Sequence, residues 1–304
     1  MLYNSLIKSK NYFKYKNIRF YNSIRNCLFP MYQNIRNKKL LKFKGQIFKD
    51  IIFENINYKL LLDNDNGFVD QEIFWKGVYE EEVMSCLKTQ IDFLFSKEKV
   101  KYNVKNIESH HESVVFLDIG CNIGQELIFA ASINKNIKAI GFEPLSHLCK
   151  QINASIEINN LSNAKVYNVA MGNEDQEINI KIPEINIGGS SIVRDASNTN
   201  CKLKVEKIKV RHADNFLQEQ KIDKVDIIKI DVEGYEYEVL DGLRETLQKY
   251  SPIILIEYSP VFYVGEFSDR GEKTLRLMSD LGYTYTIIDG DINTDQANLL
   301  FKIK

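Results

Sequence analysis

The segment Ile227–Leu240, which reads IIKIDVEGYEYEVL, combines apolar and charged residue types in a pattern that could support catalysis. Its apolar run predicts a buried strand, yet Lys229 lies inside that run, and Asp231 and Glu233 follow just before Gly234. Side chains two residues apart in a strand point to the same face, so Lys229 could pair with Asp231 or stabilise a forming oxyanion. Asp231 could serve as a general base, a metal ligand or a helix cap, and Glu233 also suits the start of a helix.

Polar groups follow three other apolar runs. The run VVFLDIG leads into a glycine-containing turn, where the backbone can approach a ligand closely; the residues concerned are Asp118, Gly120, Asn122 and Gly124. The run KAIGFE ends in Glu143, 25 residues after Asp118, and an acid at this distance suits the two hydroxyls of a ribose. The run PIILIEYS carries Glu257, which with Asp231 is a candidate for a base or for a ligand of a divalent metal.

Two common nucleotide-binding motifs are absent. A dinucleotide fingerprint reads GxGxxG, but from Gly120 this chain reads GCNIGQ, which places Asn122 and Gln125 where glycines are needed. The GK[ST] of a phosphate-binding loop does not occur in the glycine turn. The ligand of this turn is therefore neither a typical dinucleotide nor a P-loop phosphate.

From Val114 onward, continuous apolar runs alternate with amphipathic segments, which predicts an α/β protein with a doubly wound, mostly parallel sheet. In such a sheet ligands bind at the carboxyl ends of the strands, so the candidate residues are expected to converge there. The last two runs, YTYTIID and NLLFKI, predict an antiparallel pair at one edge of the sheet. Upstream, the DNDNG sequence predicts a hairpin around Asn64–Gly67, and residues 79–95 predict an amphipathic helix.

Acidic and basic residues are distributed unevenly along the chain. Residues 1–49 hold 12 Lys or Arg and no Asp or Glu, whereas the other 255 residues hold 28 basic and 41 acidic side chains. The arm could be a helical cap, a transit peptide, a nucleic-acid contact or a lipid-binding face. We expect an N-terminal extension over residues 1–67 and one catalytic domain over residues 68–304.

Hydropathy and cysteine usage indicate the compartment. No apolar run is long enough for a transmembrane segment, and the five cysteines form no CxxC pair or other metal-ligand spacing. This pattern is typical of reduced thiols, so we expect a cytoplasmic protein. The sequence does not define an oligomeric state.

Several of these segments together resemble the FkbM family of methyltransferases. The segments are VFLDIGCNIGQE, GFEP, NVAMGNED, the GGSS at 188–191 and VDIIKIDVEGYEYEVLDG, and the upstream IFWKGVYEEEV resembles the stretch that leads into the family's domain. The similarity covers about residues 68–304 and leaves the basic arm outside. It implies a class I Rossmann-like fold and S-adenosylmethionine as the methyl donor.

The resemblance also implies roles for individual residues. The turn formed by Asp118, Gly120, Asn122 and Gly124 would surround the methionine and ribose of the donor, Glu143 would hold the ribose hydroxyls, and Ala170 would flank the adenine. Asp231, Glu257 and Lys229 would act on the acceptor, with or without a divalent metal.

The expected reaction is O-methylation of a sugar, glycan or natural product. The alternatives are an RNA or other N-methyltransferase that binds substrate through the basic arm, and a cofactor-binding protein without turnover. No NPPY-like amine signature occurs, which disfavours a nucleic-acid partner.

Overall fold

The computed structural model describes residues 45–63, 67–102, 113–183, 203–260, 268–293 and 296–303. The chain divides into two units, Met1–Gly45 and Gln46–Lys304, and every described helix and strand belongs to the second. Most of the basic arm and the GGSS segment at 188–191 lie outside the described residues. The second unit begins at Gln46, earlier than the boundary after residue 67 that the sequence suggested, because a hairpin over residues 46–63 packs on the domain.

A seven-stranded sheet forms the centre of this unit, in the order β11-β12-β10-β9-β3-β4-β5. Neighbours from β10 to β5 are parallel, whereas β12 is antiparallel to both β10 and β11. The predicted antiparallel pair therefore lies at one edge of a mostly parallel sheet. The strands are β3 (Val114–Ile119), β4 (Ile137–Phe142), β5 (Ala164–Tyr167), β9 (Ile227–Ile230), β10 (Ile253–Tyr258), β11 (Tyr283–Gly290) and β12 (Ala297–Ile303).

The order of the strands creates a switch point between β3 and β9. The chain runs outward from β3 through β4 to β5, and later runs from β9 to β10 on the other side. Because these five strands are parallel, the loops that follow them emerge at one edge of the sheet, and ligands of doubly wound sheets bind at such a point.

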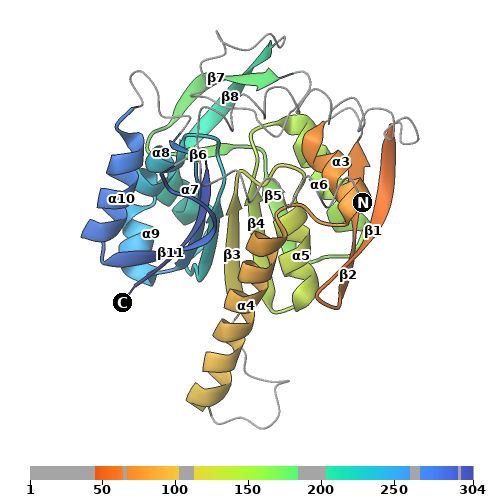
Figure 1. The fold of residues 1–304 in the computed structure, drawn as a ribbon, viewed down its shortest axis with the longest axis horizontal. Coiled ribbons are helices and arrows are strands. Elements are labelled where there is room, and N and C mark those ends of the chain that lie inside the picture. The colour runs from red at the N-terminus through yellow and green to blue at the C-terminus, as the bar shows by residue number, and fades with distance from the viewer. Residues whose placement is uncertain are drawn as a thin grey trace, which may run out of the picture. The chain divides into compact units, whose positions relative to one another are not determined.

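Helices cover both faces of the sheet, as Figure 1 shows. On one face lie α4 (Glu81–Tyr102), α5 (Gln125–Ile133) and α6 (Ser146–Ile158). On the other lie α7 (Ala213–Glu219), α8 (Glu236–Gly242), α9 (Arg244–Tyr250) and α10 (Arg270–Asp280), which share one apolar cluster with alternate residues of the strands. In β3 that cluster takes Val115, Leu117 and Ile119, so Asp118 points to the face of α4 and α5.

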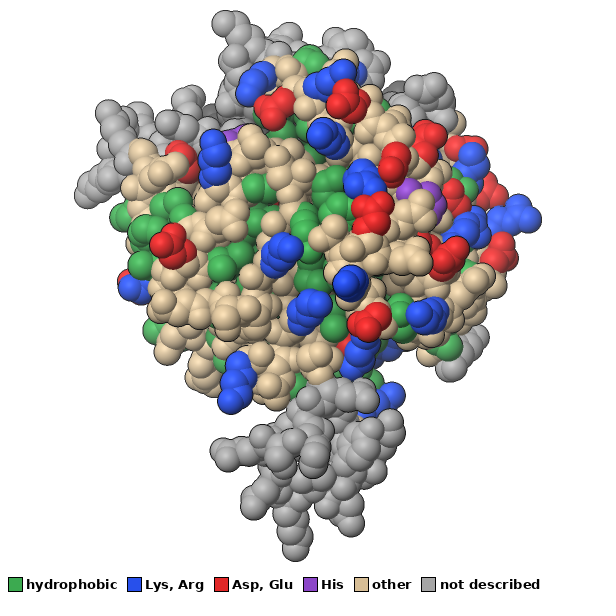
Figure 2. Space-filling view, turned by 180° about the vertical axis from the view of Figure 1, so that it is seen from behind, with side chains coloured by type: hydrophobic (Ala, Val, Ile, Leu, Met, Phe, Trp, Pro, Cys, Tyr) green, Lys and Arg blue, Asp and Glu red, His purple; other side chains and the backbone are tan. Residues whose placement is uncertain are grey.

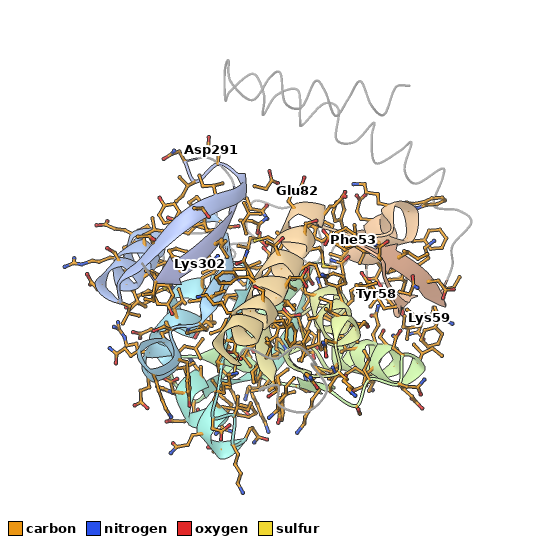
Figure 3. The ribbon with its side chains drawn as sticks, turned by 90° about the horizontal axis from the view of Figure 1, so that it is seen from below. Phe53, Tyr58, Lys59, Glu82, Asp291 and Lys302 are labelled. Carbon is orange, nitrogen blue, oxygen red and sulfur yellow. The ribbon has the colours of Figure 1, made fainter. Side chains whose placement is uncertain are left out.

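Two smaller sheets flank the central one. Strands β6 (Ala170–Gly172), β7 (Gln176–Pro183) and β8 (Leu203–His212) form a three-stranded sheet in the order β6-β8-β7. Strands β1 (Gln46–Phe53) and β2 (Ile56–Asp63) form the hairpin, whose Phe53 and Tyr58 rings lie against Phe129 of α5 at centroid distances of 5.5 and 5.8 Å (Figure 3).

The hairpin confirms a strand pair before the domain but corrects its position. It turns at Glu54 and Asn55, whose positive φ values of 47° and 65° suit a two-residue turn, whereas residues 64–66 lie outside the described ranges. Residues 68–76, expected to be extended, form helix α3 (Phe68–Lys76) instead.

The described helices and the charges on the surface concern two possible partners, a membrane and a nucleic acid. Among the described helices, none combines the length and apolar character needed to cross a bilayer. On the face opposite that of Figure 1, Lys and Arg side chains are interspersed with Asp and Glu (Figure 2). The described side chains on that face therefore form no broad surface of a single sign.

Candidate functional site

A pocket opens at the carboxyl ends of β3, β4 and β9, where the sequence predicted that the candidate residues converge. Four predicted residues line it, namely Gly120, Asn122, Glu143 and Ala170, together with Asp231 from the end of β9. The remaining lining residues are Ile119, Phe142, Pro144, Leu145, Leu148, Met171, Ile180, Val232, Glu233 and Tyr235.

The glycine turn is packed directly against the end of β9. Gly120 has a φ of +81°, and a Cβ atom there would lie 1.9 Å from the backbone oxygen of Asp231. Only glycine fits between these two backbones. Gly124, also at a φ of +81°, precedes α5, and a Cβ there would lie 3.0 Å from the Ile152 side chain of α6. Gly124 therefore permits helix packing and is not among the residues that line the pocket.

Glu143 is held in place by the backbone on both sides of it. Its Oε2 atom accepts a hydrogen bond from the Asn122 N–H at 3.0 Å, and its Oε1 atom accepts one from the Leu145 N–H at 2.9 Å. Burial raises the pKa of Glu143 to about 8, even though both hydrogen bonds favour the ionised form. The carboxyl group is thus fixed at the wall of the pocket with lone pairs left for a ligand.

Asp118 occupies a different position from the one expected. It is fully buried on β3 and does not line the pocket. Burial raises its pKa to about 8, although nearby Lys229 favours its ionised form. Its register partner in β9 is Lys229, so the two side chains point to the same face of the sheet.

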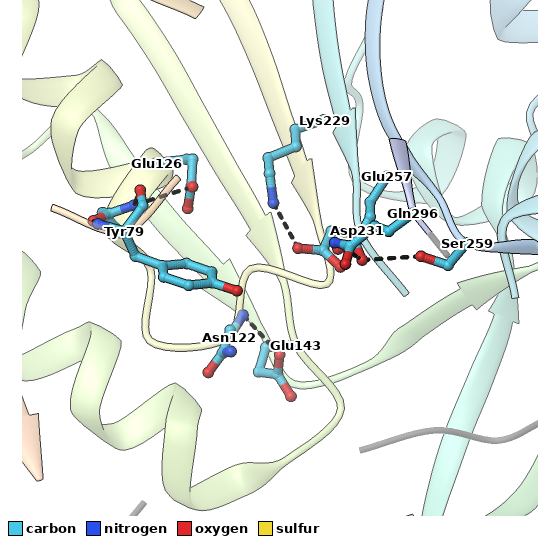
Figure 4. A network of polar contacts seen from close by, with 10 residues as sticks. Tyr79, Asn122, Glu126, Glu143, Lys229, Asp231, Glu257, Ser259 and Gln296 are labelled. Carbon is cyan, nitrogen blue, oxygen red and sulfur yellow. Dashed lines mark hydrogen bonds and ion pairs between the residues drawn. The ribbon is translucent and has the colours of Figure 1, made fainter. Parts of the chain in front are cut away.

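Lys229, Asp231 and Glu257 form a continuous chain of polar contacts (Figure 4). The Lys229 Nζ atom donates to Asp231 Oδ2 at 3.0 Å, and the carboxyl groups of Asp231 and Glu257 share a hydrogen bond. Glu257 is fixed on its other side by the Ser259 hydroxyl, which donates to Oε1 at 3.0 Å, and by the Gln296 amide. Asp231 alone of the three lines the pocket.

Burial and charge give these three groups different protonation states. Burial opposes ionisation of Asp231, but the Lys229 ammonium and the hydrogen bonds hold the Asp231 pKa below its usual value. Burial, and then the Asp231 charge, raise the pKa of Glu257 well above its usual value. Burial opposes the charge on Lys229, but the surrounding carboxyl groups keep its pKa well above the usual value. These shifts favour an ammonium at Lys229, a carboxylate at Asp231 and a protonated Glu257 that donates to Asp231.

Several residues at this site were not predicted. The Gln125 side chain hydrogen-bonds the backbone of Tyr79, and Gln296, from the connection between β11 and β12, hydrogen-bonds Glu257. Glu233, interpreted from the sequence as a helix-terminal acid, lines the pocket, while the Glu236 carboxylate accepts the Gly234 N–H at the start of α8. These contacts depend on tertiary packing, so no local sequence pattern predicts them.

The structure does not support the metal site considered from the sequence. Within the ranges that the structure describes, no three His, Cys, Asp or Glu side chains converge as ligands for an ion. The partners of Asp231 and Glu257 are instead an ammonium, a hydroxyl and an amide.

Comparison with known proteins identifies the domain. A family profile described as the methyltransferase FkbM domain matches residues 118–285, which is more than half of the chain. The matched region contains the glycine turn, Glu143 and the three polar side chains of Lys229, Asp231 and Glu257. No curated protein matches.

Solved structures resemble this chain at low identity. A methyltransferase FkbM from Methylobacillus flagellatus KT is 18% identical, with 65% of this chain and 45% of that chain covered and a TM-score of 0.44. This chain thus spans less than half of the Methylobacillus protein. A precorrin-6y C5,15-methyltransferase from Geobacter metallireducens GS-15 is 12% identical, with 75% and 92% covered and a TM-score of 0.41. An O-methyltransferase from Bacillus cereus in complex with S-adenosylhomocysteine is 11% identical, with 79% and 99% covered and a TM-score of 0.41.

The family assignment rests on the matched segment and agrees with the α/β topology. The chain belongs to the methyltransferase FkbM domain family.

Proposed function

We propose that this protein transfers a methyl group from S-adenosylmethionine to a hydroxyl, with a sugar, glycan or natural product as the acceptor. The observation that carries this proposal is the Lys229–Asp231–Glu257 chain, which presents a carboxylate at the wall of the pocket formed by the glycine turn. The proposal includes a cytoplasmic location, which is supported by the free thiols of Cys86, Cys121 and Cys149.

The pocket has the chemistry needed to hold the donor. The Glu143 carboxyl group at its wall suits the ribose hydroxyls, and Leu148 and Met171 offer apolar surface to the adenine near Ala170. The backbone of Gly120 and Asn122 remains open to the methionine part because no side chain at Gly120 can intervene.

When bound, the donor supplies an electrophilic methyl group on a cationic sulfur. The chain's own residues then have two tasks, which are to orient the acceptor hydroxyl and to receive its proton. Asp231 does both, because its carboxylate accepts a hydrogen bond from the hydroxyl and takes up the proton as the new bond to oxygen forms. Lys229 and Glu257 act through Asp231, which they keep ionised and fixed in orientation.

This arrangement favours a hydroxyl over an amine acceptor. A neutral amine is nucleophilic without losing a proton, whereas an alcohol becomes a better nucleophile as its proton moves to a base. An ionised carboxylate at the pocket wall therefore serves an alcohol more than an amine. The mixed charge of the face in Figure 2 gives no support for an RNA contact there.

The proposal is tested with labelled S-adenosylmethionine and fractions of a cell extract, using wild-type protein, Asp231→Asn, and the control Asp223→Asn at an exposed site. We expect the wild type to label a carbohydrate or small-molecule fraction at a hydroxyl. Asp231→Asn should lower turnover by about 10²- to 10⁴-fold, because the base is lost, with little change in donor affinity by calorimetry.

Two outcomes would contradict the proposal. Absence of donor binding by the wild type would remove the cofactor assignment, and normal turnover in Asp231→Asn would remove Asp231 as the base. Label found on nitrogen or on RNA would favour the alternative reaction.

A further inference from the structure

The turn that precedes α4 is tied to the cofactor side of the site by one buried side chain. The Tyr79 N–H donates to Gln125 Oε1 at 2.7 Å, and Gln125 Nε2 donates back to the Tyr79 carbonyl oxygen at 2.9 Å. Gln125 is only 2% exposed and directly follows the glycine turn, as the first residue of α5. The backbone of Tyr79 is therefore fixed relative to the turn that lines the pocket.

Glu80 adopts an unusual backbone conformation within this turn. Its φ is +50°, which residues other than glycine seldom adopt, and its carbonyl oxygen accepts hydrogen bonds from Val83 and Met84 at the start of α4. Such a conformation costs about 1 kcal/mol or more and persists where surrounding contacts maintain it.

Both side chains of the turn face the acceptor side of the site. Glu80 interacts electrostatically with Asp231 and Lys229, and Tyr79 with Glu257 and Asp231. Figure 4 shows the Tyr79 ring pointing towards Asn122. Neither Tyr79 nor Glu80 lines the donor pocket. Both lie close enough to Asp231 to interact with its charge, and so adjoin the residue proposed to contact the acceptor.

The polar groups of these side chains have no partner among the described residues. Neither the Tyr79 hydroxyl nor the Glu80 carboxyl group makes a hydrogen bond or an ion pair with them, although both side chains are mostly enclosed. Burial, followed by the Asp231 charge, raises the pKa of Glu80 to about 8, so at neutral pH the group can donate as well as accept. A bound acceptor that carries hydroxyls would offer both groups a hydrogen-bond partner.

We propose that the Tyr79–Glu80 turn forms the acceptor-binding wall of this site and selects uncharged, hydroxyl-bearing acceptors. In this assignment Glu80 hydrogen-bonds a second hydroxyl of the acceptor, and Tyr79 packs against the acceptor with its hydroxyl within reach. The Asp231 carboxylate, held ionised beside Lys229, would repel an acceptor that carries a phosphate or a carboxylate. The inference rests on the proposed function, because it takes Asp231 as the group that contacts the reacting hydroxyl.

The test compares Glu80→Ala, Glu80→Gln and Tyr79→Phe with Glu82→Gln. Glu82 is a matched control, because it lies in the same Glu-Glu-Glu run but is exposed at the start of α4 (Figure 3). The probes are uncharged methyl glycosides and the glucuronide counterpart of methyl glucoside. Binding to each protein saturated with S-adenosylhomocysteine is measured by saturation-transfer NMR, and KM and kcat are measured with labelled donor wherever transfer occurs.

We expect Glu80→Ala to raise the acceptor Kd and KM by at least about tenfold, while S-adenosylhomocysteine affinity changes less than about twofold. Glu80→Gln should stay within about threefold of the wild type, because an amide keeps a donor and an acceptor without the charge. Tyr79→Phe should weaken acceptor binding in the same direction, and Glu82→Gln should behave as wild type. The glucuronide should bind at least about tenfold more weakly than the glucoside.

Three results would overturn the inference. These are unchanged acceptor affinity in Glu80→Ala, equal binding of the glucuronide, and no binding of any uncharged glycoside by wild-type protein that binds S-adenosylhomocysteine. Failure of the proposed function gives a different result, namely no binding of S-adenosylhomocysteine itself. If Glu80→Ala does not fold, the outcome is decided by Tyr79→Phe, which removes only one hydroxyl, and by the wild-type comparison of the glucuronide with the glucoside.

Discussion

At the scale of single residues, Lys229 determines how Asp231 behaves. The two side chains point to the same face of β9, and the ammonium lies 3.0 Å from the carboxylate in surroundings where Lys229 is only 5% exposed. Without that charge, burial would raise the Asp231 pKa, as it does at neighbouring Glu257. Lys229 is thus a positioning residue that favours the ionised form of Asp231, the proposed base.

Lys229→Gln should therefore move the acidic limb of the kcat/KM profile to higher pH. Asp231 must be ionised to act, and losing the ammonium raises the pKa at which it ionises, so activity near pH 6.5 should fall by at least about tenfold and partly recover near pH 9. The measurement is kcat/KM from pH 5 to 9.5, with Lys138→Gln as an exposed control. An unshifted acidic limb would show that Lys229 does not set this ionisation.

Glu143 should control donor affinity in a pH-dependent way. Glu143→Ala should weaken S-adenosylhomocysteine binding by about 10- to 100-fold, because hydrogen bonds to a charged acceptor contribute about 1.5–3 kcal/mol. Burial raises the Glu143 pKa to about 8, so in the wild type affinity should increase as pH rises from 6.5 to 9 and the carboxyl group ionises. Calorimetry is carried out on the wild type and on Glu143→Gln. Ionisation of the ligand would change the affinity of both proteins equally, whereas ionisation of Glu143 would change only that of the wild type.

At the scale of elements, the close approach of the β3 turn and the end of β9 builds the site. A Cβ at Gly120 would meet the Asp231 backbone oxygen at 1.9 Å, and that oxygen belongs to a residue with little freedom to move. Gly120→Ala should therefore destabilise the fold by about 2 kcal/mol or more and abolish donor binding.

Gly282→Ala is the matched control for that prediction. Gly282 has nearly the same φ, +84°, but a Cβ there would meet only one Ile303 atom, at 3.8 Å. The Gly282→Ala variant has the backbone strain without the steric clash, so it should lower the free energy of unfolding by only about 1 kcal/mol. Urea unfolding of both variants checks the difference, and equal losses would show that the β3 turn relaxes around the new side chain.

The elements also explain which parts of the site the sequence could predict. Strands buried on both faces have continuous apolar sequences, and parallel strands bring their carboxyl ends to one edge of the sheet. The positions of Glu143, Asp231 and Glu257 at that edge could therefore be predicted from sequence and topology, while their roles stay a prediction. The Tyr79–Glu80 turn could not be found in this way. Its position depends on an amide contact from Gln125, 46 residues further along the chain. The hairpin was expected at Asn64–Gly67 because Asn-Asp-Asn-Gly favours turns, but the strands pair around Glu54 and Asn55 instead.

At the scale of the whole molecule, buried acids link stability to pH. Burial is the largest cause that raises the pKa of Asp70 to about 7 and those of Glu80, Asp118 and Glu143 to about 8. Between about pH 4 and 8 the folded protein therefore holds protons that the unfolded chain has released. Stability from these groups is complete below their unfolded pKa values and is lost as pH rises through the folded ones.

The midpoint of thermal unfolding should therefore be higher at pH 5.5 than at pH 8.5. A linkage of a few kcal/mol, at about 2–4 °C per kcal/mol for a protein of this size, predicts a fall of at least about 5 °C. Asp231 and other acids with lowered pKa values titrate below pH 5.5, so they do not reverse the expected fall of the unfolding midpoint with rising pH. Calorimetric scans across this range are the measurement, and a midpoint that rises with pH would contradict the assignment.

Asp70→Asn isolates one of these groups without removing its contacts. The Asp63 N–H and the Gln151 amide both donate to the Oδ1 atom of Asp70, each at 2.7 Å, and asparagine retains an oxygen that can accept both. The variant removes a proton-binding group that ties β2 and α3 to α6, so its unfolding midpoint should fall less between pH 4 and 8.5 than that of the wild type. Asp223→Asn, at an exposed site, should leave the wild-type slope unchanged. If Asp70→Asn retains the full slope, the pH dependence must arise at the acids around the sheet edge, and donor binding should then alter it.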